Sequence, residues 1–247
     1  MVWRVSGTGD PLVLLHGGAG SWTHWSRNVA ALVPRHRLLL PDMPGFGDSD
    51  GLKLTDSVDP LALALTEGID ALIGARPFHL VGFSFGGLVA ARMARLAGAR
   101  VRRLILVGAS GFGLPTSLRL SLQRWRGLSP TDQEAVHVHN LRVLMLAGKV
   151  DAEAVRLQAA NARRARLNSR PWSNRPILRE TLAELKVPLG AIWGGADAIL
   201  QDDLDRRIDI LRGCDPACPV SVIDGAGHWV AFEAPHRFAT ALLPMLT

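Results

Sequence analysis

A serine with a glycine two positions away on each side stands in the stretch Gly82-Phe83-Ser84-Phe85-Gly86. An apolar run of strand length, 78–81, leads into it, and a helical pattern of small residues follows without a loop. A chain that passes from strand to helix so abruptly strains the serine backbone, and side chains at the two glycine positions would collide. An ordinary turn containing a serine is the alternative. We predict that Ser84 is a nucleophile at a helix start, where free N–H groups stabilise developing negative charge.

A serine hydroxyl needs an adjacent base, and the base needs a third group to orient it. Asp197 and His228 each lie just beyond a predicted strand. Serine, then acid, then histidine is the order expected when this chemistry is built on a parallel sheet. We therefore predict Ser84, Asp197 and His228 as the catalytic residues. The competing acids are Asp202, Asp203 and Asp224.

The elements that must position these side chains follow an alternating pattern. Strands are expected at residues 2–5, 12–15, 38–40, 78–81, 104–107, 187–193 and 220–223, and helices at 22–32, 58–73, 201–211 and 233–246. Strands that alternate with helices predict an α/β fold with a mostly parallel sheet, covered by helices on both faces. Ligands of such folds bind beyond the carboxyl ends of the strands, where His16, Ser84 and Ser110 lie.

The alternation stops between Gly111 and about Glu180, where no buried strand is expected. Helical patterns occur at 131–147 and 151–167, joined by Gly, Pro and Ser. An insertion at that point of the chain would cover the site as a helical lid. We therefore divide the sequence into a core domain, 1–112 and 180–247, and a lid insertion, 113–179.

Composition limits the class of protein. The 247 residues are 48% hydrophobic, enough for one large core, and no apolar run reaches the ~20 residues that span a bilayer. The N-terminus has no apolar signal region, so we expect a cytoplasmic protein with Cys214 and Cys218 as free thiols. The net charge of +6 comes from dispersed arginines without a nucleic-acid-binding motif. We expect no metal, cofactor, nucleic acid or membrane partner, and a monomer or homodimer.

The sequence resembles the α/β-hydrolases that carry a lid. The resemblance covers about 1–112 and 180–247 and lies in 14–18, 42–49, 82–87, 194–197 and 227–229. It implies Ser84 as nucleophile, His228 as base and Asp197 as its partner, with the backbone N–H groups of Phe85 and Gly18 as oxyanion donors. Relatives carry a further N-terminal strand, so we expect this sheet edge to be one strand short. The sibling dehalogenases and epoxide hydrolases have a carboxylate in place of Ser84.

The substrate is expected to be a small apolar or aromatic molecule. The residues predicted to bind it are Gly17, Phe83, Phe112, Trp125 and Trp229. The leading hypothesis is a serine hydrolase that cleaves small carboxylic esters through an acyl-enzyme. The alternative is hydrolysis of a carbon–carbon bond in vinylogous diketones from ring fission, which is favoured if a lid arginine reaches the pocket. The lid arginines considered are Arg156, Arg163, Arg164, Arg166 and Arg170. A non-enzymatic sensor on the same fold is the third hypothesis.

Overall fold

Seven strands form one mixed sheet in the computed structural model, which describes residues 1–52, 56–114, 120–200 and 203–247. The strands are β1 (Val2–Ser6), β2 (Asp10–Leu15), β3 (His36–Asp42), β4 (Phe78–Phe83), β5 (Val101–Val107), β6 (Leu189–Gly194) and β7 (Val220–Ile223). Their order is β1-β3-β2-β4-β5-β6-β7. Only the pairing of β1 with β3 is antiparallel within this sheet. The predicted mostly parallel sheet is confirmed, and β1 and β7 form its two edges.

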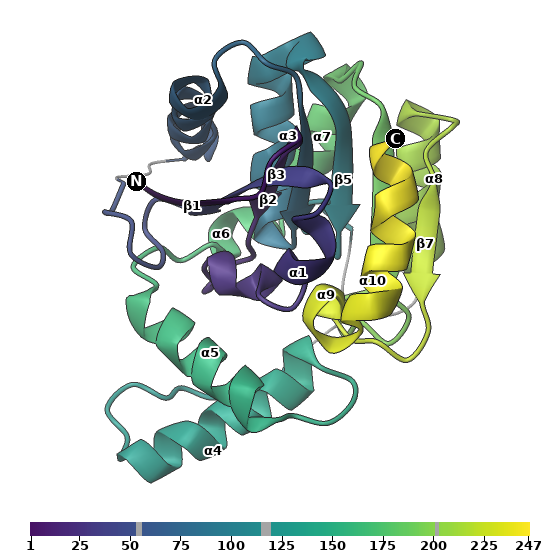
Figure 1. The fold of residues 1–247 in the computed structure, drawn as a ribbon. Helices are drawn as coiled ribbons and strands as arrows, with labels where there is room; N and C mark the ends of the chain where they lie inside the picture. The colour runs from purple at the N-terminus through teal and green to yellow at the C-terminus, as the bar shows by residue number, and fades with distance from the viewer. Residues whose placement is uncertain (53–55, 115–119, 201–202) are drawn as a thin grey trace.

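Helices cover both faces of the sheet, as the alternating pattern predicts (Figure 1). One face carries α2 (Asp59–Ile73), α3 (Phe85–Ala97), α7 (Ile177–Glu184) and α8 (Leu204–Cys214). The other carries α1 (Val29–Leu32), α9 (Val230–Glu233) and α10 (Pro235–Leu242). Central strands such as β4 are buried along their whole length, because apolar side chains from both faces pack against helices.

The segment between β5 and α7, which includes most of the predicted lid insertion (113–179) and is called the lid segment below, holds helices and no strand among its described residues. It contains α4 (Pro130–Asn140), a π-helical turn η3 (Leu141–Met145), α5 (Ala152–Arg164) and α6 (Arg170–Ser173). Figure 1 places α4 and α5 together beyond the ends toward which the β5 and β7 arrows point. This is the side of the sheet on which a ligand of an α/β fold binds.

Two predicted helices are interrupted. The helix expected at 22–32 is a 3-10 turn, η1 (Trp22–Trp25), followed by the short α1. Between them, the Asn28 side chain donates to the carbonyl of Ala231, so distant contacts override the local pattern. The helix expected at 233–246 is split into α9, α10 and the 3-10 turn η5 (Leu243–Leu246). The first break is at Ala234, because the residue before Pro235 is disfavoured in helical geometry.

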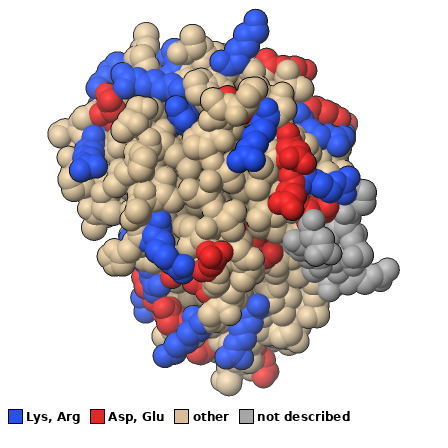
Figure 2. Space-filling view, turned by 90° about the vertical axis from the view of Figure 1, so that its right-hand side faces the viewer, with Lys and Arg blue, Asp and Glu red and all other residues tan. Residues whose placement is uncertain are grey.

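Basic side chains are dispersed over the molecule. Figure 2 shows lysine and arginine in separate places on one face, with acidic side chains between them. Both Cys214 and Cys218 are free thiols, and burial raises the pKa of Cys218 to about 11. In the part of the chain that the structure describes, no helix is both long and apolar enough to cross a membrane.

Candidate active site

Ser84 lies between β4 and α3 in strained geometry, with φ of 51° and ψ of −118°. Its N–H donates to the carbonyl of Val107 on the neighbouring strand (2.9 Å), so the sheet holds the strained residue. A Cβ on Gly82 would lie 2.6 Å from the Cα of Gly87, and one on Gly86 would lie 2.7 Å from the carbonyl oxygen of Leu15. The two glycines are therefore required by close backbone contacts on both sides of the serine.

The structure brings Ser84, His228 and Asp197 together. His228 Nε2 lies 3.0 Å from Ser84 Oγ, and His228 Nδ1 lies 2.8 Å from Asp197 Oδ2. Both His228 and Asp197 are buried. An imidazole between a hydroxyl and a buried carboxylate can take the hydroxyl proton, while the carboxylate fixes its tautomer and stabilises the imidazolium.

Backbone contacts hold the acid in place. Asp197 Oδ1 accepts the N–H of Ile199 (2.8 Å), which leaves Oδ2 to face the histidine. Gly108, with φ of 51°, lies against both groups, since a Cβ there would be 3.3 Å from His228 Nδ1 and 3.4 Å from Asp197 Oδ2. Of the competing acids, Asp203 pairs with Arg206, and Asp202 lies outside the described residues. The carboxyl group that contacts His228 is that of Asp197.

Two histidines hold the glycine loop that follows β2. His16 Nε2 accepts the N–H of Met43 (2.9 Å), so its proton is on Nδ1, which donates to the carbonyl of Gly17 (2.8 Å). The N–H of Gly17 donates to His24 Nδ1 (3.2 Å). Both hydrogen-bonding groups of Gly17 are thus held by imidazoles.

Both imidazoles are neutral near pH 7. Burial lowers the pKa of His16 to about 4 and lowers the pKa of His24 well below its ordinary value, because the charged form loses its hydration. A neutral His24 is what the loop requires, since only an unprotonated Nδ1 can accept the N–H of Gly17.

This arrangement fixes the direction of the Gly18 N–H, the predicted oxyanion donor. The Gly17 carbonyl and the Gly18 N–H belong to one planar peptide unit and point in opposite directions. Because the carbonyl points to His16, the N–H points away from it. A Cβ on Gly18 would lie 3.9 Å from the Cβ of Phe85, whose own N–H is in the open first turn of α3. The two predicted donors therefore come from adjacent segments.

The predicted substrate-binding residues are placed differently from one another. Gly17 lies close to the serine, since a Cβ there would be 3.2 Å from the Cβ of Ser84. Phe83 packs on the catalytic histidine candidate, with ring centroids 4.9 Å apart. Trp229 is buried, stacks on Phe232 at 4.0 Å and donates its indole N–H to the carbonyl of His24.

The remaining two, Phe112 and Trp125, have their aromatic contacts with residues outside the catalytic candidates. Phe112 is buried in the core with Arg207 over its ring. Trp125 packs on His137 of α4, with ring centroids 5.4 Å apart. Its contacts are within the lid segment, so a role in substrate binding stays a prediction.

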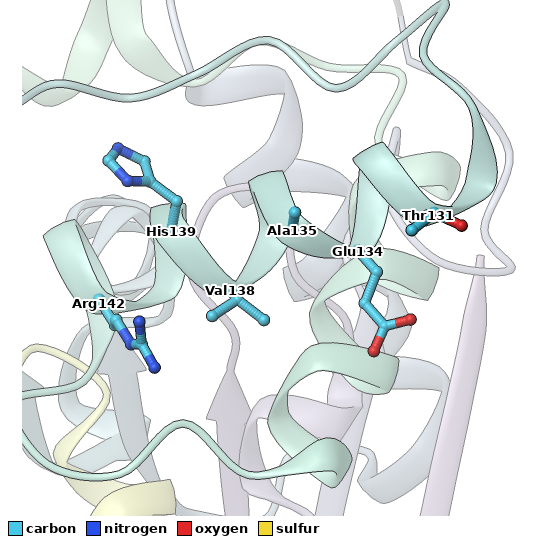
Figure 3. A pocket seen from close by; sticks show the side chains of 6 residues that line it. All are labelled: Thr131, Glu134, Ala135, Val138, His139 and Arg142. Carbon is cyan, nitrogen blue, oxygen red and sulfur yellow. The ribbon is translucent and has the colours of Figure 1, made fainter.

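None of the five lid arginines is buried. Arg164 pairs with Asp48, and Arg166 donates to the carbonyl of Ser49. A surface groove also runs along α4 (Figure 3). Its lining residues are Thr131, Glu134, Ala135, Val138, His139 and Arg142. The groove contains none of the predicted site residues.

The sequence patterns did not single out three residues beside the site. His24 accepts from the glycine loop, and Ser169 of the lid segment lies against Gly18, so closely that its Oγ leaves no room for a Cβ there. Glu233 accepts the N–H of Gly227, next to the histidine. Their contacts are with residues distant in the sequence or with backbone groups, so no local pattern points to them.

The chain is similar to known hydrolases over nearly its whole length. The model of the alpha/beta hydrolase family matches residues 12–241. The chain is 30% identical to a 2-hydroxy-6-oxononadienedioate/2-hydroxy-6-oxononatrienedioate hydrolase of Burkholderia vietnamiensis, over 98% of this chain and 88% of that protein. It is 27% identical to a 2-hydroxy-6-oxo-6-phenylhexa-2,4-dienoate hydrolase of Comamonas testosteroni, over 96% of this chain and 87% of that protein.

Solved structures share the fold. A putative aryl esterase from Burkholderia cenocepacia superposes with a TM-score of 0.80 at 23% identity, over 98% of this chain and 92% of that one. A meta-cleavage product hydrolase from Pseudomonas fluorescens IP01 gives a TM-score of 0.79 at 23% identity and the same coverage. At this identity the likeness concerns the fold, which both named activities share.

Proposed function

The chain belongs to the alpha/beta hydrolase family, and within it we propose that this enzyme hydrolyses a carbon–carbon bond in vinylogous diketones of the 2-hydroxy-6-oxo-2,4-dienoate type. The observation that carries the proposal is that relatives named for such substrates match nearly the whole chain, through the segments that hold Ser84, Asp197 and His228. The hydrolase class itself follows from the family. Of our sequence-based hypotheses, this alternative is better supported than the ester-hydrolase reading.

The proposed reaction begins with a proton shift. The enol proton of the 2-hydroxyl group moves to C5, which gives a 2,6-diketone with a double bond between C3 and C4. Without this shift, the bond between C5 and C6 would break to leave an unstabilised vinyl carbanion. After it, the electron pair released at C5 spreads through the double bond onto the C2 carbonyl oxygen.

Bond cleavage then follows the serine template. Ser84 Oγ attacks the C6 carbonyl while His228 takes its proton, and the N–H groups of Phe85 and Gly18 stabilise the oxyanion. Collapse breaks the bond between C5 and C6, and His228 returns the proton to the released dienolate. Water, activated by His228, then hydrolyses the acyl group on Ser84. The net reaction adds one water and yields a carboxylic acid and a 2-hydroxy-2,4-dienoate.

Ester hydrolysis is the second candidate. The same serine, base and oxyanion donors cleave an ester, whose alkoxide leaves without a prior proton shift. The exposed positions of the five lid arginines favour it, because the dienoate substrate carries a carboxylate that an ester need not have.

The test compares two substrates on the same purified protein. Loss of the conjugated chromophore of 2-hydroxy-6-oxo-6-phenylhexa-2,4-dienoate is followed beside release of p-nitrophenol from its acetate ester. We expect kcat/KM to be higher for the dienoate by at least tenfold, and both activities to be lost in Ser84→Ala. A higher kcat/KM for the ester would replace the proposal by the ester candidate, and dienoate turnover that persists in Ser84→Ala would contradict the mechanism.

A further inference from the structure

One carboxylate connects the loop that contains His228, residues 227–229, to the lid segment. We call this loop the histidine loop. Glu233, the last residue of α9, accepts the N–H of Gly227 at Oε2 (2.6 Å). The same carboxylate accepts the N–H of Ala147 at Oε2 (3.2 Å) and the N–H of Gly148 at Oε1 (2.5 Å). Three backbone donors from two segments about 80 residues apart therefore share this side chain.

The two segments also contact each other directly on both sides of His228. The N–H of Trp229 donates to the carbonyl of Met145 (2.7 Å). A Cβ on Gly227 would lie 2.6 Å from the nitrogen of Ala147, so the backbones are packed too closely for a side chain. The residues before and after the histidine are thus both fastened to residues 145–148, at the end of the π-helical turn η3.

We propose that Glu233 is a positioning residue for His228, and that its carboxylate holds the base in line with Ser84 by clamping the histidine loop to residues 145–148 of the lid segment. The inference rests on the proposed function, because it assigns His228 the role of base. Glu233 does not contact the serine; it acts through the backbone of Gly227. Misplacement of a catalytic group by about 1 Å can lower a rate by about 100-fold, so the loss of such a clamp is measurable.

A second ionic contact supplies a matched control. Arg27 pairs with Asp151 and Glu153 at the start of α5, both at 2.6 Å. This contact also ties the lid segment to the core, but neither carboxylate accepts from the histidine loop. Glu153→Gln therefore weakens attachment of the lid without releasing Gly227.

The experiment measures inactivation by a fluorophosphonate, which reports activation of Ser84 by His228 independently of substrate choice. Rates are measured on folded protein, well below each thermal midpoint, for wild type, Glu233→Gln and Glu153→Gln. In Glu233→Gln an amide NH₂ replaces one acceptor oxygen and faces a backbone N–H. We expect inactivation slowed by about 10- to 100-fold, and kcat lowered equally with KM unchanged. Glu153→Gln should stay within twofold of wild type.

A second variant, on the lid side of the contact, tests the same proposal if Glu233→Gln does not fold. A Cβ on Gly148 would meet Glu233 Oε1 at 3.0 Å and, apart from the two neighbouring residues, no other atom within 4 Å. Gly148→Ala therefore displaces the carboxylate while leaving the core unchanged. We expect a severalfold slower inactivation at nearly unchanged stability, and an unchanged rate would overturn the proposal.

The other outcomes separate the two claims. A wild-type protein that turns over the dienoate without reacting with the fluorophosphonate overturns the roles of Ser84 and His228 in the proposed function, and this inference with them. A reactive wild type with equally reactive Glu233→Gln overturns the inference alone. If inactivation is slowed in Glu153→Gln as much as in Glu233→Gln, the inference is also overturned. Weaker attachment of the lid segment would then explain the effect without any role for Glu233.

Discussion

The serine turn and the histidine loop are held in different ways. Ser84 is fixed by its neighbours in the sheet, through the N–H bond to Val107 and the close packing of Gly82 and Gly86. The histidine loop, 227–229, is fixed by side chains and by the lid segment, through Asp197, Glu233 and the carbonyl of Met145. The nucleophile is therefore held by the packed backbone of neighbouring strands, and its base by side chains and by the lid segment.

Because of this difference, we expect substitutions in the two regions to affect stability and activity differently. A change at the serine turn has to distort packed backbone, so it should lower stability together with activity. A change around His228 can shift an imidazole with little effect on the core, so it should lower kcat first.

The largest expected effect is on the histidine side. Asp197→Asn keeps the size of the side chain but loses the charge that fixes the tautomer of His228 and stabilises the imidazolium. We expect kcat to fall by about 10⁴-fold with the free energy of unfolding nearly unchanged. Steady-state kinetics and urea denaturation measure the two quantities.

Asp224→Asn is the control, since its carboxylate forms no contact with His228 in the structure. Near-normal kcat in Asp197→Asn, together with loss of activity in Asp224→Asn or Asp203→Asn, would show that the acid is misassigned.

On the serine side, Gly86→Ala places a Cβ against the carbonyl oxygens of His16 and Leu15. Overpacking of this kind costs about 1–3 kcal/mol, so we expect the free energy of unfolding and kcat to fall together. Urea denaturation measures the loss. Gly213→Ala is the matched control, because Gly213 of α8 is exposed and nothing outside the adjacent backbone lies within 4 Å of its Cβ position. Equal stability in the two variants would contradict the packing account.

A smaller effect is expected from His79 on β4, the strand that leads to Ser84. Burial lowers its pKa to about 4. Between pH 6.5 and 4 the unfolded chain therefore binds more protons than the folded one, so stability falls as the pH falls through this window and is level above it. We expect His79→Gln to reduce the slope of unfolding free energy against pH by up to about 1.4 kcal/mol per pH unit. An unchanged slope would exclude this histidine as a source.

The smallest effect is expected in the lid segment. Arg164 and Asp48 form an exposed pair, and such pairs contribute at most about 1 kcal/mol. We expect Arg164→Gln to change the free energy of unfolding by less than about 1 kcal/mol. KM for the dienoate should stay within about twofold of the wild-type value. A KM raised by tenfold or more would instead place this arginine on the substrate carboxylate.

The sequence predicts those features of the fold and site that depend on local patterns, and it misses those that depend on contacts between distant segments. The strands, the Gly82–Gly86 turn and the order of Ser84, Asp197 and His228 rest on local patterns, and the structure has the strands and brings these three side chains together. The break near Asn28 depends on the carbonyl of Ala231, about 200 residues away. His24 accepts the N–H of Gly17, and Glu233 accepts N–H groups of Gly227 and of residues 147–148. These contacts form only in the folded chain, so no local spacing in the sequence predicts them.

The most direct test of the central claim is covalent labelling of the nucleophile. Active enzyme is incubated with a fluorophosphonate, digested and mapped by mass spectrometry. Because Ser84 Oγ lies 3.0 Å from His228 Nε2, we predict a single adduct on Ser84 and loss of activity in proportion to labelling. An adduct on another residue, or full activity with no adduct, would contradict the account.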